Sequence, residues 1–292
     1  LDRRWFALVV GVPFVVIVGY LSRRLLHPTF WTVLPPRDFS VYERLLTEPR
    51  ILVDYLQNWF IPKLYTTGVF QDHVVKSTGL FTPVTTVLSI VAILGLLGFA
   101  FWSRRKWPLL ALAILFFFTN HLLESTVVNL ELYFEHRNYL AVCLFLVPLA
   151  AALWNHSSRR VFALVSLATL LLLGGFTRYS STVWQTYDGI VQASAAKAPT
   201  SARAQTQYAV LLFNANYHDE GMRVLDDAIA NIPGDHPLLL ATRLIAMCNL
   251  KTLEPAELDR IAAILSGLKF DARMLRVYNN FAKVVVTNQC PA

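Results

Sequence analysis

The segment from residue 121 to residue 139, HLLESTVVNLELYFEHRNY, concentrates ionisable side chains between two strongly apolar segments. It contains three glutamates, two histidines and one arginine. Charged groups in or beside the hydrocarbon of a membrane are costly unless they face a cavity or pair with a partner. We therefore take this segment as the candidate functional site.

The polar residues of this segment are separated by 3, 7, 4 and 3 positions, which predicts one polar stripe along a helical surface. The stripe consists of His121, Glu124, Glu131, Glu135 and Asn138. A turn in the segment is also expected, because two apolar runs flank it. The candidates for that turn are Ser125, Thr126 and Asn129. It would place Glu131 and Glu135 in the first turns of the following helix, where negative charge is favourable.

The adjacent residues His136 and Arg137 can hold a phosphate at a membrane boundary. Arg offers a planar fork of donors, and His acts as a donor or proton carrier. Glutamates beside them can orient these cations or position an acceptor hydroxyl. This pattern suits an enzyme whose donor is a lipid phosphate or pyrophosphate. In the structural alternative, Glu135 pairs with Arg137, Arg50 or Lys63 and the cluster only anchors the hairpin.

The composition predicts a polytopic, all-α membrane protein. Of 292 residues, 55% are hydrophobic and 15% charged, and the apolar residues gather in long runs. Five runs qualify as transmembrane helices. They are Trp5 to Leu21, Pro83 to Trp102, Pro108 to Leu123, Tyr139 to Trp154 and Val161 to Phe176. They define a membrane domain at residues 1–176, with an outer-face helical loop at 22–82, and a second domain at 177–292.

The short basic segments set the expected orientation. Arg3 and Arg4, the run 104–106, and Arg159 and Arg160 all lie on one side if the N-terminus is cytoplasmic. The 22–82 loop, the glutamate-rich turn and residues 177–292 then lie on the outer face of the membrane. The net charge of +7 comes mostly from residues 1–176, so we exclude nucleic acid as a partner.

The long outer loop contains the sequence FSVYERLLTEPRILVDYLQNWFIPKLY, whose apolar residues recur at helical intervals. Pro49 is expected to divide it into two short helices, and Pro62 to end the second. These helices either pack over the bundle as a scaffold or take a direct part in binding a lipid-linked ligand.

The segment Ser201 to Pro233 predicts two helices with a break at residues 214–220. Small residues at 209, 221 and 228 allow close approach, and the pattern is that of one tetratricopeptide repeat. Segments 237–250, 254–268 and 272–286 predict further helices, so a short stack is expected. The acidic residues at 219, 220, 226 and 227 are read as a solvated face rather than a metal site.

Cys248 and Cys290 are candidates for a disulfide, and Cys143 for a small core residue.

The segment LELYFEHRNYLAVCLFL resembles the C-terminal membrane motif of the TMTC-like branch of the GT-C glycosyltransferases, which carry tetratricopeptide repeats after their last span. The segment LLTEPRILVDYLQNWFIPKLY, followed by residues 71–73 and 77–79, is similar to that family's outer loop. The resemblance covers nearly the whole chain and includes bacterial relatives, which implies a bacterial inner-membrane protein whose outer face is periplasmic. One departure is Ala141, which stands where the family pattern has proline.

The resemblance implies a glycosyltransferase that uses a polyprenyl-phosphate sugar, with no nucleotide-sugar cofactor. It implies donor-phosphate contacts at Arg137, His136 and Tyr139. Glu135, Glu131, Glu124 and Asn138 are assigned as supporting residues, without a protein metal site. The family's catalytic acid follows the first span of a longer N-terminal half, and no acidic pair occupies that place here. The catalytic residue is therefore unassigned, and we expect either the C-terminal part of an enzyme or a derivative without catalysis.

Two functions are therefore expected to compete. The first is transfer of a sugar to a periplasmic protein or glycan. The alternative is a noncatalytic membrane-anchored repeat scaffold that docks an envelope complex through residues 177–292. A transporter is less favoured, because the sequence lacks an inverted repeat and helices broken by glycine.

Overall fold

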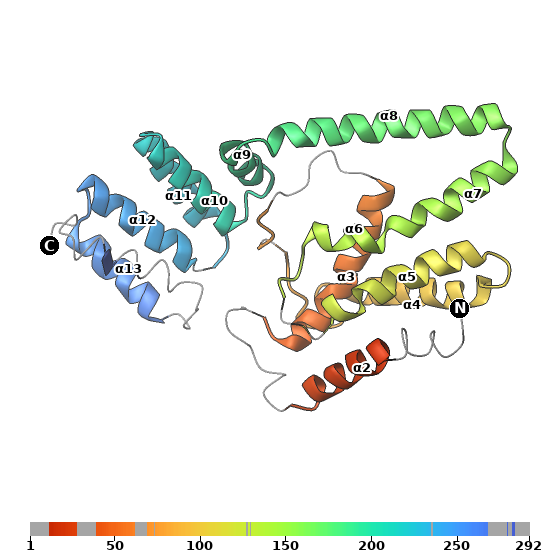
Figure 1. Cartoon of the computed structure of the whole chain (residues 1–292). Coiled ribbons are helices and arrows are strands. Elements are labelled where there is room, and N and C mark those ends of the chain that lie inside the picture. Colours follow the sequence, from red (N-terminus) through yellow and green to blue (C-terminus); the bar gives the residue numbers. More distant parts are fainter. Residues whose placement is uncertain are drawn as a thin grey trace. The chain divides into compact units, whose positions relative to one another are not determined.

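The chain is helical throughout the part that the computed structural model describes (Figure 1). The described residues are 12–27, 39–61, 69–72, 74–126, 128, 130–234, 236–267, and 279, 282 and 283. Within these ranges no strand occurs, and a single isolated bridge joins Gly79 and Thr82. The all-α class is thus confirmed for these ranges. The chain forms two compact units, Leu1–Pro62 with Val75–Ala168, and Lys63–Val74 with Thr169–Ala292.

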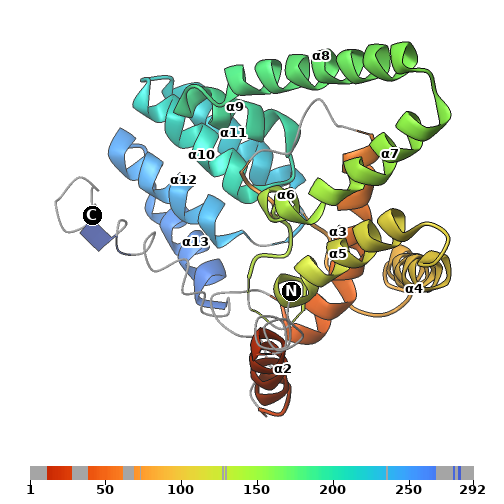
Figure 2. The ribbon, with the colours of Figure 1, turned by 45° about the vertical axis from the view of Figure 1, so that its right-hand side comes forward.

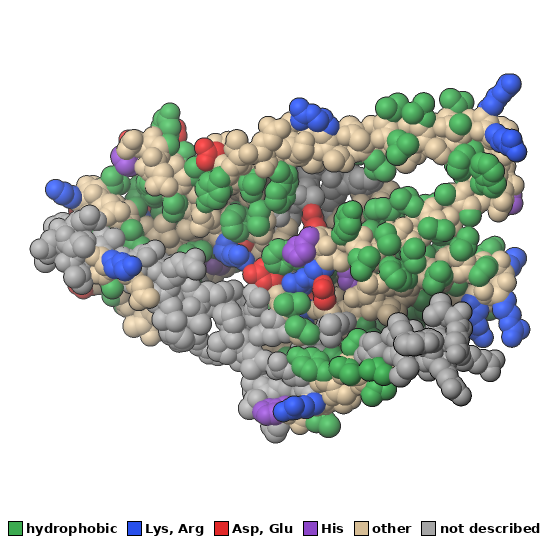
Figure 3. All heavy atoms as spheres, in the orientation of Figure 1, with side chains coloured by type: hydrophobic (Ala, Val, Ile, Leu, Met, Phe, Trp, Pro, Cys, Tyr) green, Lys and Arg blue, Asp and Glu red, His purple; other side chains and the backbone are tan. Residues whose placement is uncertain are grey.

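Two helices are long and apolar enough to cross a membrane, α4 (Thr85–Ser103) and α8 (Arg159–Val183). A third crossing is possible if the segment Glu135–Ala141 and the segment Cys143–His156, which meet at 46°, together form one broken span. All described residues of α8 have accessible side chains, and Figure 3 shows hydrophobic side chains along this helix. An apolar helix whose side chains are accessible along its length is suited to lipid. Membrane association is therefore supported.

The described helices at two other predicted spans, α5 and α2, are shorter than α4 and α8. Helix α5 (Pro108–Glu124) is apolar but has 17 residues, about 26 Å at the helical rise. Helix α2 (Val12–Leu25) covers the later part of the first predicted span, and residues 5–11 lie outside the described residues. Leu21 of α2 packs against Val41 in the first unit.

Helix α3 (Val41–Phe60) is one continuous helix, so the predicted division at Pro49 is wrong. Its first turn is fixed by a capping box, in which Ser40 and Glu43 satisfy each other's backbone amides. The buried side chains of α3 continue on both sides of Pro49, from Leu46 and Thr47 to Ile51 and Leu52. Packing of this face outweighs the one backbone hydrogen bond that proline cannot make. The helix ends at Phe60, two residues before Pro62.

The connection after α5 is not helical, so the predicted continuous polar stripe on one helix surface is wrong. Helix α5 ends at Glu124, and residues 130–134 are irregular. The chain then forms the 3-10 helix η3 (Glu135–Arg137), α6 (Asn138–Ala141), the 3-10 helix η4 (Cys143–Phe145) and α7 (Leu146–His156). The turn begins at Ser125, one of the predicted positions, whereas Asn129 lies outside the described residues. Glu131 precedes the helix instead of lying in its first turn.

The second unit contains α9 (Tyr187–Lys197), α10 (Ala202–Asn214), α11 (His218–Asn231), α12 (Pro237–Leu250) and α13 (Pro255–Gly267) (Figure 2). These bounds confirm the helices predicted between residues 201 and 268. Most of the helix predicted at 272–286 lies outside the described residues. The assignment of the helix pairs as tetratricopeptide repeats stays a prediction.

Small residues allow close helix packing in this unit, as expected from the sequence. Ala209, Leu225, Ala228 and Leu239 are buried in one core cluster. A Cβ atom added to Gly221 would lie 2.6 Å from the ring of Phe213, so only glycine leaves room for that ring.

The cysteines fall into two chemical states. Cys248 is disulfide-bonded, whereas Cys143 is free and exposed, which contradicts the prediction of a core position for Cys143. Cys290, the predicted partner of Cys248, lies outside the described residues.

Candidate functional site

Arg44 of α3 holds the connection that follows α5, and only 1% of this residue is exposed. Its Nε donates to the carbonyl of Thr126 at 3.2 Å, and its Nη1 to the carbonyl of Leu130 at 2.5 Å. Its Nη2 donates to the carbonyl of Glu124. The guanidinium therefore gathers three carbonyls that the end of α5 and the irregular segment leave without helical partners.

Glu48 is the counterion of this buried arginine. Its Oε1 lies 2.7 Å from Nη2 of Arg44, four residues earlier on the same helix. Burial raises the pKa of Glu48 from 4.5 to about 7, although Arg44 and a hydrogen bond with Ser125 oppose this shift. Loss of solvation thus outweighs the favourable charge of the arginine. The carboxyl group of Glu48, with a pKa near neutrality, thus lies where α3 contacts the connection after α5.

A second set of contacts joins α3 to the segment before η3. The hydroxyl of Tyr55 donates to the carbonyl of Phe134 at 2.9 Å and accepts from the Phe134 amide at 2.7 Å. The hydroxyl of Tyr133 donates to Asp54 Oδ2 at 2.7 Å. Asn58 donates both to Asp54 and to the Tyr133 hydroxyl, at 2.9 and 3.0 Å. Burial raises the pKa of both tyrosines, and the Asp54 carboxylate raises that of Tyr133 further.

Two residues of the predicted stripe meet across the connection. His121 near the end of α5 is buried, and its Nε2 lies 3.5 Å from Oδ1 of Asn138 in α6. The ring of His121 stacks on Tyr55 with 5.6 Å between centroids, and Asn138 donates to the Tyr55 carbonyl at 3.5 Å. His121 and Asn138 therefore hold α5, α6 and α3 together rather than face a ligand.

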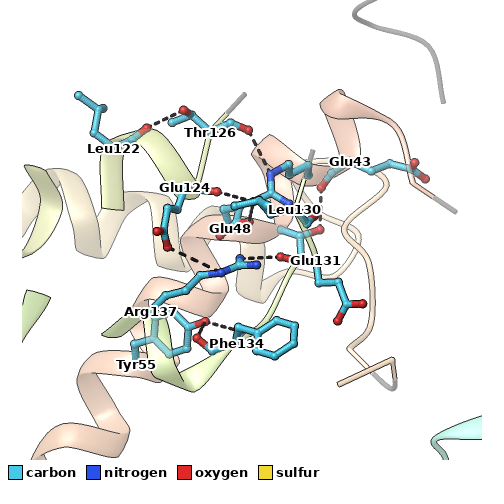
Figure 4. A network of polar contacts seen from close by, with 12 residues as sticks. Glu43, Glu48, Tyr55, Leu122, Glu124, Thr126, Leu130, Glu131, Phe134 and Arg137 are labelled. Atoms are coloured by element: carbon cyan, nitrogen blue, oxygen red, sulfur yellow. Dashed lines mark hydrogen bonds and ion pairs between the residues drawn. The ribbon is translucent and has the colours of Figure 1, made fainter. Parts of the chain in front are cut away.

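Arg137 contacts two more residues of the predicted stripe, Glu124 and Glu131 (Figure 4). Its Nη1 donates to the carbonyl of Glu131 at 2.7 Å, and its Nε lies 3.7 Å from Oε2 of Glu124. The guanidinium carbon is 5.2 Å from the ring centroid of Phe134. In Figure 4 the carboxylate of Glu131 points away from Arg137, so the backbone of Glu131, and not its charge, orients the arginine.

His136 and Tyr139 lie on the exposed side of the same short helical segment. They are three residues apart, which places them on one helical face. Tyr139 is 85% exposed, and His136 is also exposed. Glu135 is half-buried in η3. The structure thus groups Glu124, Glu131 and Arg137, and directs His136 and Tyr139 outward.

Arg44 and Arg137 differ in how many guanidinium nitrogens are already hydrogen-bonded to the protein. All three nitrogens of the Arg44 guanidinium are bonded to protein carbonyls. Within the described residues, Arg137 makes one hydrogen bond, and its contact with Glu124 at 3.7 Å is longer than a hydrogen bond. The Arg137 side chain is only 12% exposed and that of Glu124 is 42% exposed, so an anion reaches the guanidinium only where Glu124 gives way. Of the two, Arg137 is the arginine that can still bind a phosphate.

Sequence reasoning missed Arg44, Glu48 and Tyr55, although a signal for them exists. Val41, Arg44, Glu48, Ile51 and Tyr55 follow one another at steps of 3, 4, 3 and 4, and all five are buried. Two opposite charges in register with apolar residues indicate a buried ion pair. The expected division of the helix at Pro49 concealed this spacing.

The sequence also predicted that Glu135 could pair with Arg50 or Lys63, and assigned no protein metal site. Arg50 donates to the Val75 carbonyl at 2.8 Å and to the Ser77 hydroxyl at 3.3 Å, and Lys63 lies outside the described residues. Among the residues that the structure describes, no three His, Cys, Asp or Glu side chains gather in a way that can hold a metal ion.

Comparisons of the chain with protein-family models, with curated proteins and with solved structures found no match.

Proposed function

We propose that the chain is a membrane glycosyltransferase, or the C-terminal part of one, that takes its sugar from a polyprenyl phosphate. The acceptor is a periplasmic protein or glycan. The observation that carries the proposal is the arrangement around Arg137, which keeps donors for an anion next to exposed His136 and Tyr139. The motifs in residues 45–65 and 130–146 support the same reaction class.

The roles follow from the contacts. Arg137 binds a phosphate oxygen as Glu124 moves away, and the Glu131 carbonyl keeps the guanidinium in place. His136 donates a hydrogen bond or a proton to the phosphate, and Tyr139 lines the route of the lipid. Arg44 and Glu48 position the segment that supplies the Glu124 and Glu131 contacts. Glu135 and Asn138 support the fold of this helical segment.

The test compares Arg137→Ala and Arg137→Lys with the unchanged protein in membranes. We expect Arg137→Ala to abolish sugar transfer from a polyprenyl-phosphate donor and Arg137→Lys to retain part of it, since lysine keeps the charge without the fork. Arg260→Ala serves as the control, because this exposed arginine lies on α13 and pairs with Glu257. Folded Arg137→Ala protein with normal transfer would rule out the site. Binding of a short-chain polyprenyl phosphate, measured by native mass spectrometry, separates loss of the donor from loss of the fold.

A noncatalytic scaffold is the second candidate, and the helical unit favours it. Helices α10 to α13 form successive packed pairs in the second unit, and stacked helix pairs offer extended surfaces to other proteins. Affinity capture with the full-length protein distinguishes the two candidates. A scaffold retains its envelope partner in Arg137→Ala and shows no transfer activity in any variant.

A further inference from the structure

Basic side chains gather at two turns of the first unit, and each turn joins two apolar helices. The α4–α5 turn (residues 104–107) carries Arg104, Arg105 and Lys106, and the α7–α8 turn (residues 157–160) carries Arg159 and Arg160. All of these basic residues are exposed. Figure 3 shows Lys and Arg side chains at the end of the α4–α5 pair and at the beginning of α8. The two turns therefore present a group of positive charges to their surroundings.

The two turns lie at the same end of the first unit, because α5 and α7 run in opposite directions. His121, late in α5, lies 3.5 Å from Asn138 between Nε2 and Oδ1. One turn earlier in α5, Phe117 packs against Phe145, which follows Asn138 in the chain, with 5.9 Å between ring centroids. A step back along α5 is thus a step forward towards α7. The start of α5 and the end of α7 are therefore at one end, as both ribbon views show (Figures 1 and 2).

The α4–α5 turn is a short connection that the backbone fixes. The carbonyl of Ser103, the last residue of α4, accepts from the amides of Lys106 and Trp107 at 2.9 and 2.7 Å. Ser103 is buried. Pro108 opens α5 at a position where a helix needs no amide donor. The three basic side chains of this turn are therefore held close together on one tight bend.

Two exposed tryptophans flank the same bend. The ring centroid of Phe99 lies 6.0 Å from that of Trp102 and 6.0 Å from that of Trp107. The Lys106 ammonium lies 5.0 Å from the centroid of the Trp107 ring. Tryptophan is enriched where the hydrocarbon of a membrane meets its headgroups, since the indole has an apolar body and a polar N–H. The aromatic cluster thus suits a position at that boundary.

The length of α4 places the bend at the same level. Helix α4 has 19 residues, about 28 Å at the helical rise, which is close to the roughly 30 Å of the hydrocarbon. A crossing by α4 therefore brings Arg104 to the headgroups. No aspartate or glutamate occurs between residues 74 and 123 or between 136 and 187, so the joined helices supply no carboxylate to these cations. The phosphates of the headgroups are the anions at this level.

We propose that the α4–α5 and α7–α8 turns form one binding surface for the headgroups of anionic phospholipids. Residues 104–106 bind the phosphates, Arg159 and Arg160 extend the surface, and Trp102 and Trp107 set its depth in the membrane. A cluster of about four to eight Lys or Arg beside a transmembrane helix is typical of binding to anionic lipids. The surface is separate from the Arg137 site and does not depend on the proposed sugar transfer.

Native mass spectrometry of the full-length protein tests this surface by titration with phosphatidylglycerol or with phosphatidylcholine of the same acyl chains. We expect phosphatidylglycerol to bind the unchanged protein about tenfold more tightly. Arg104→Gln/Arg105→Gln/Lys106→Gln should lose most of this preference, and Arg159→Gln/Arg160→Gln should lose part of it. The variant with all of these substitutions should bind the two lipids within about twofold of each other.

The matched control removes the same charge from the second unit. Arg223→Gln/Lys251→Gln/Arg260→Gln replaces three exposed basic residues and should leave the lipid preference unchanged. Arg104→Lys/Arg105→Lys keeps the charge of the α4–α5 turn and should keep most of the preference. Circular dichroism of each variant reports whether the helices are retained.

Several results would overturn the proposal. Equal binding of the two lipids by the unchanged protein would mean that no selective surface exists. An unchanged preference in the variant that lacks all the basic residues of both turns would place the lipid elsewhere. An equal loss in the control variant would reduce the effect to net charge. Displacement of phosphatidylglycerol by inorganic phosphate at the same concentration would make a free anion the ligand.

Discussion

At the scale of single residues, the site depends on one buried arginine and its carboxylate. Arg44 bonds three carbonyls, and Glu48 lies 2.7 Å from it with 2% of the residue exposed. A buried charge is tolerated only with its partners, so removing one partner leaves the other uncompensated. Residues 130–134 between α5 and η3 are irregular and rely on this pair.

Arg44→Ala is therefore expected to lower the free energy of unfolding by about 3–5 kcal/mol, because Glu48 loses its counterion and three carbonyls lose their hydrogen-bond donor. Arg44→Lys should recover little of this loss, since one ammonium group cannot reach all three acceptors. Chemical denaturation in detergent measures both variants. Arg260→Ala, which removes an exposed pair on α13, should change stability by less than about 1 kcal/mol. Equal effects of the two alanine variants would contradict a special role for Arg44.

Glu48 makes stability depend on pH in a defined direction. Its pKa is raised from 4.5 to about 7, so the folded protein keeps a proton that the unfolded chain releases. The resulting stability is fully present below pH 4.5 and is lost as the pH rises through 7. Between pH 4.5 and 8 the free energy of unfolding should fall by roughly 1–3 kcal/mol more in the unchanged protein than in Glu48→Gln. Parallel curves for the two proteins would show that Glu48 has an ordinary pKa.

At the scale of elements, close packing decides which helices form and how they pair. Helix α3 remains unbroken through Pro49 because its buried face is continuous. In the second unit, α10 and α11 lie side by side in both ribbon views (Figures 1 and 2) and share one core cluster. Their approach depends on Gly221, above which the ring of Phe213 lies.

Gly221→Ala is expected to destabilise the second unit by about 1–3 kcal/mol, although alanine is the better helix former. Its Cβ would meet three ring atoms of Phe213 at 2.6 to 3.0 Å, so the ring must move. Gly267→Ala in α13 is the matched control, because no atom lies within 4 Å of its added Cβ. Thermal denaturation followed by circular dichroism compares the two. A more stable Gly221→Ala protein would mean that Phe213 is free to rotate away.

At the scale of the whole molecule, the apolar helices define the membrane crossings. Helices α4 and α8 are long enough, and the pair η3–α6 and η4–α7 forms a possible broken span. Helix α5 reaches about 26 Å against roughly 30 Å of hydrocarbon. Whether α5 crosses decides on which side residues 104–106 lie relative to the helical unit.

Single-cysteine labelling in a Cys143→Ser background measures this arrangement. If α5, the bent pair and α8 all cross, three crossings separate Arg105→Cys from Asp227→Cys. A membrane-impermeant maleimide should then label Asp227→Cys in intact spheroplasts and Arg105→Cys only after the membrane is opened. Protein without an added cysteine is the control for Cys248, which is disulfide-bonded. Labelling of both positions from the same side would show that one of the three does not cross, or that none of them does.

The sequence by itself determined the helical class, two long apolar helices, the helices between residues 201 and 268 and the polar character of the segment 121–139. These properties follow from local composition and spacing, which act within a few helical turns. Tertiary structure alone decided that α3 continues through Pro49, that residues 130–134 are irregular, and that Arg44 and Glu48 are buried partners. It also placed the carboxylate of Asp72 at the first turn of α10. Each of these depends on contacts between residues about 30 to 130 positions apart, whose packing energy exceeds local preference.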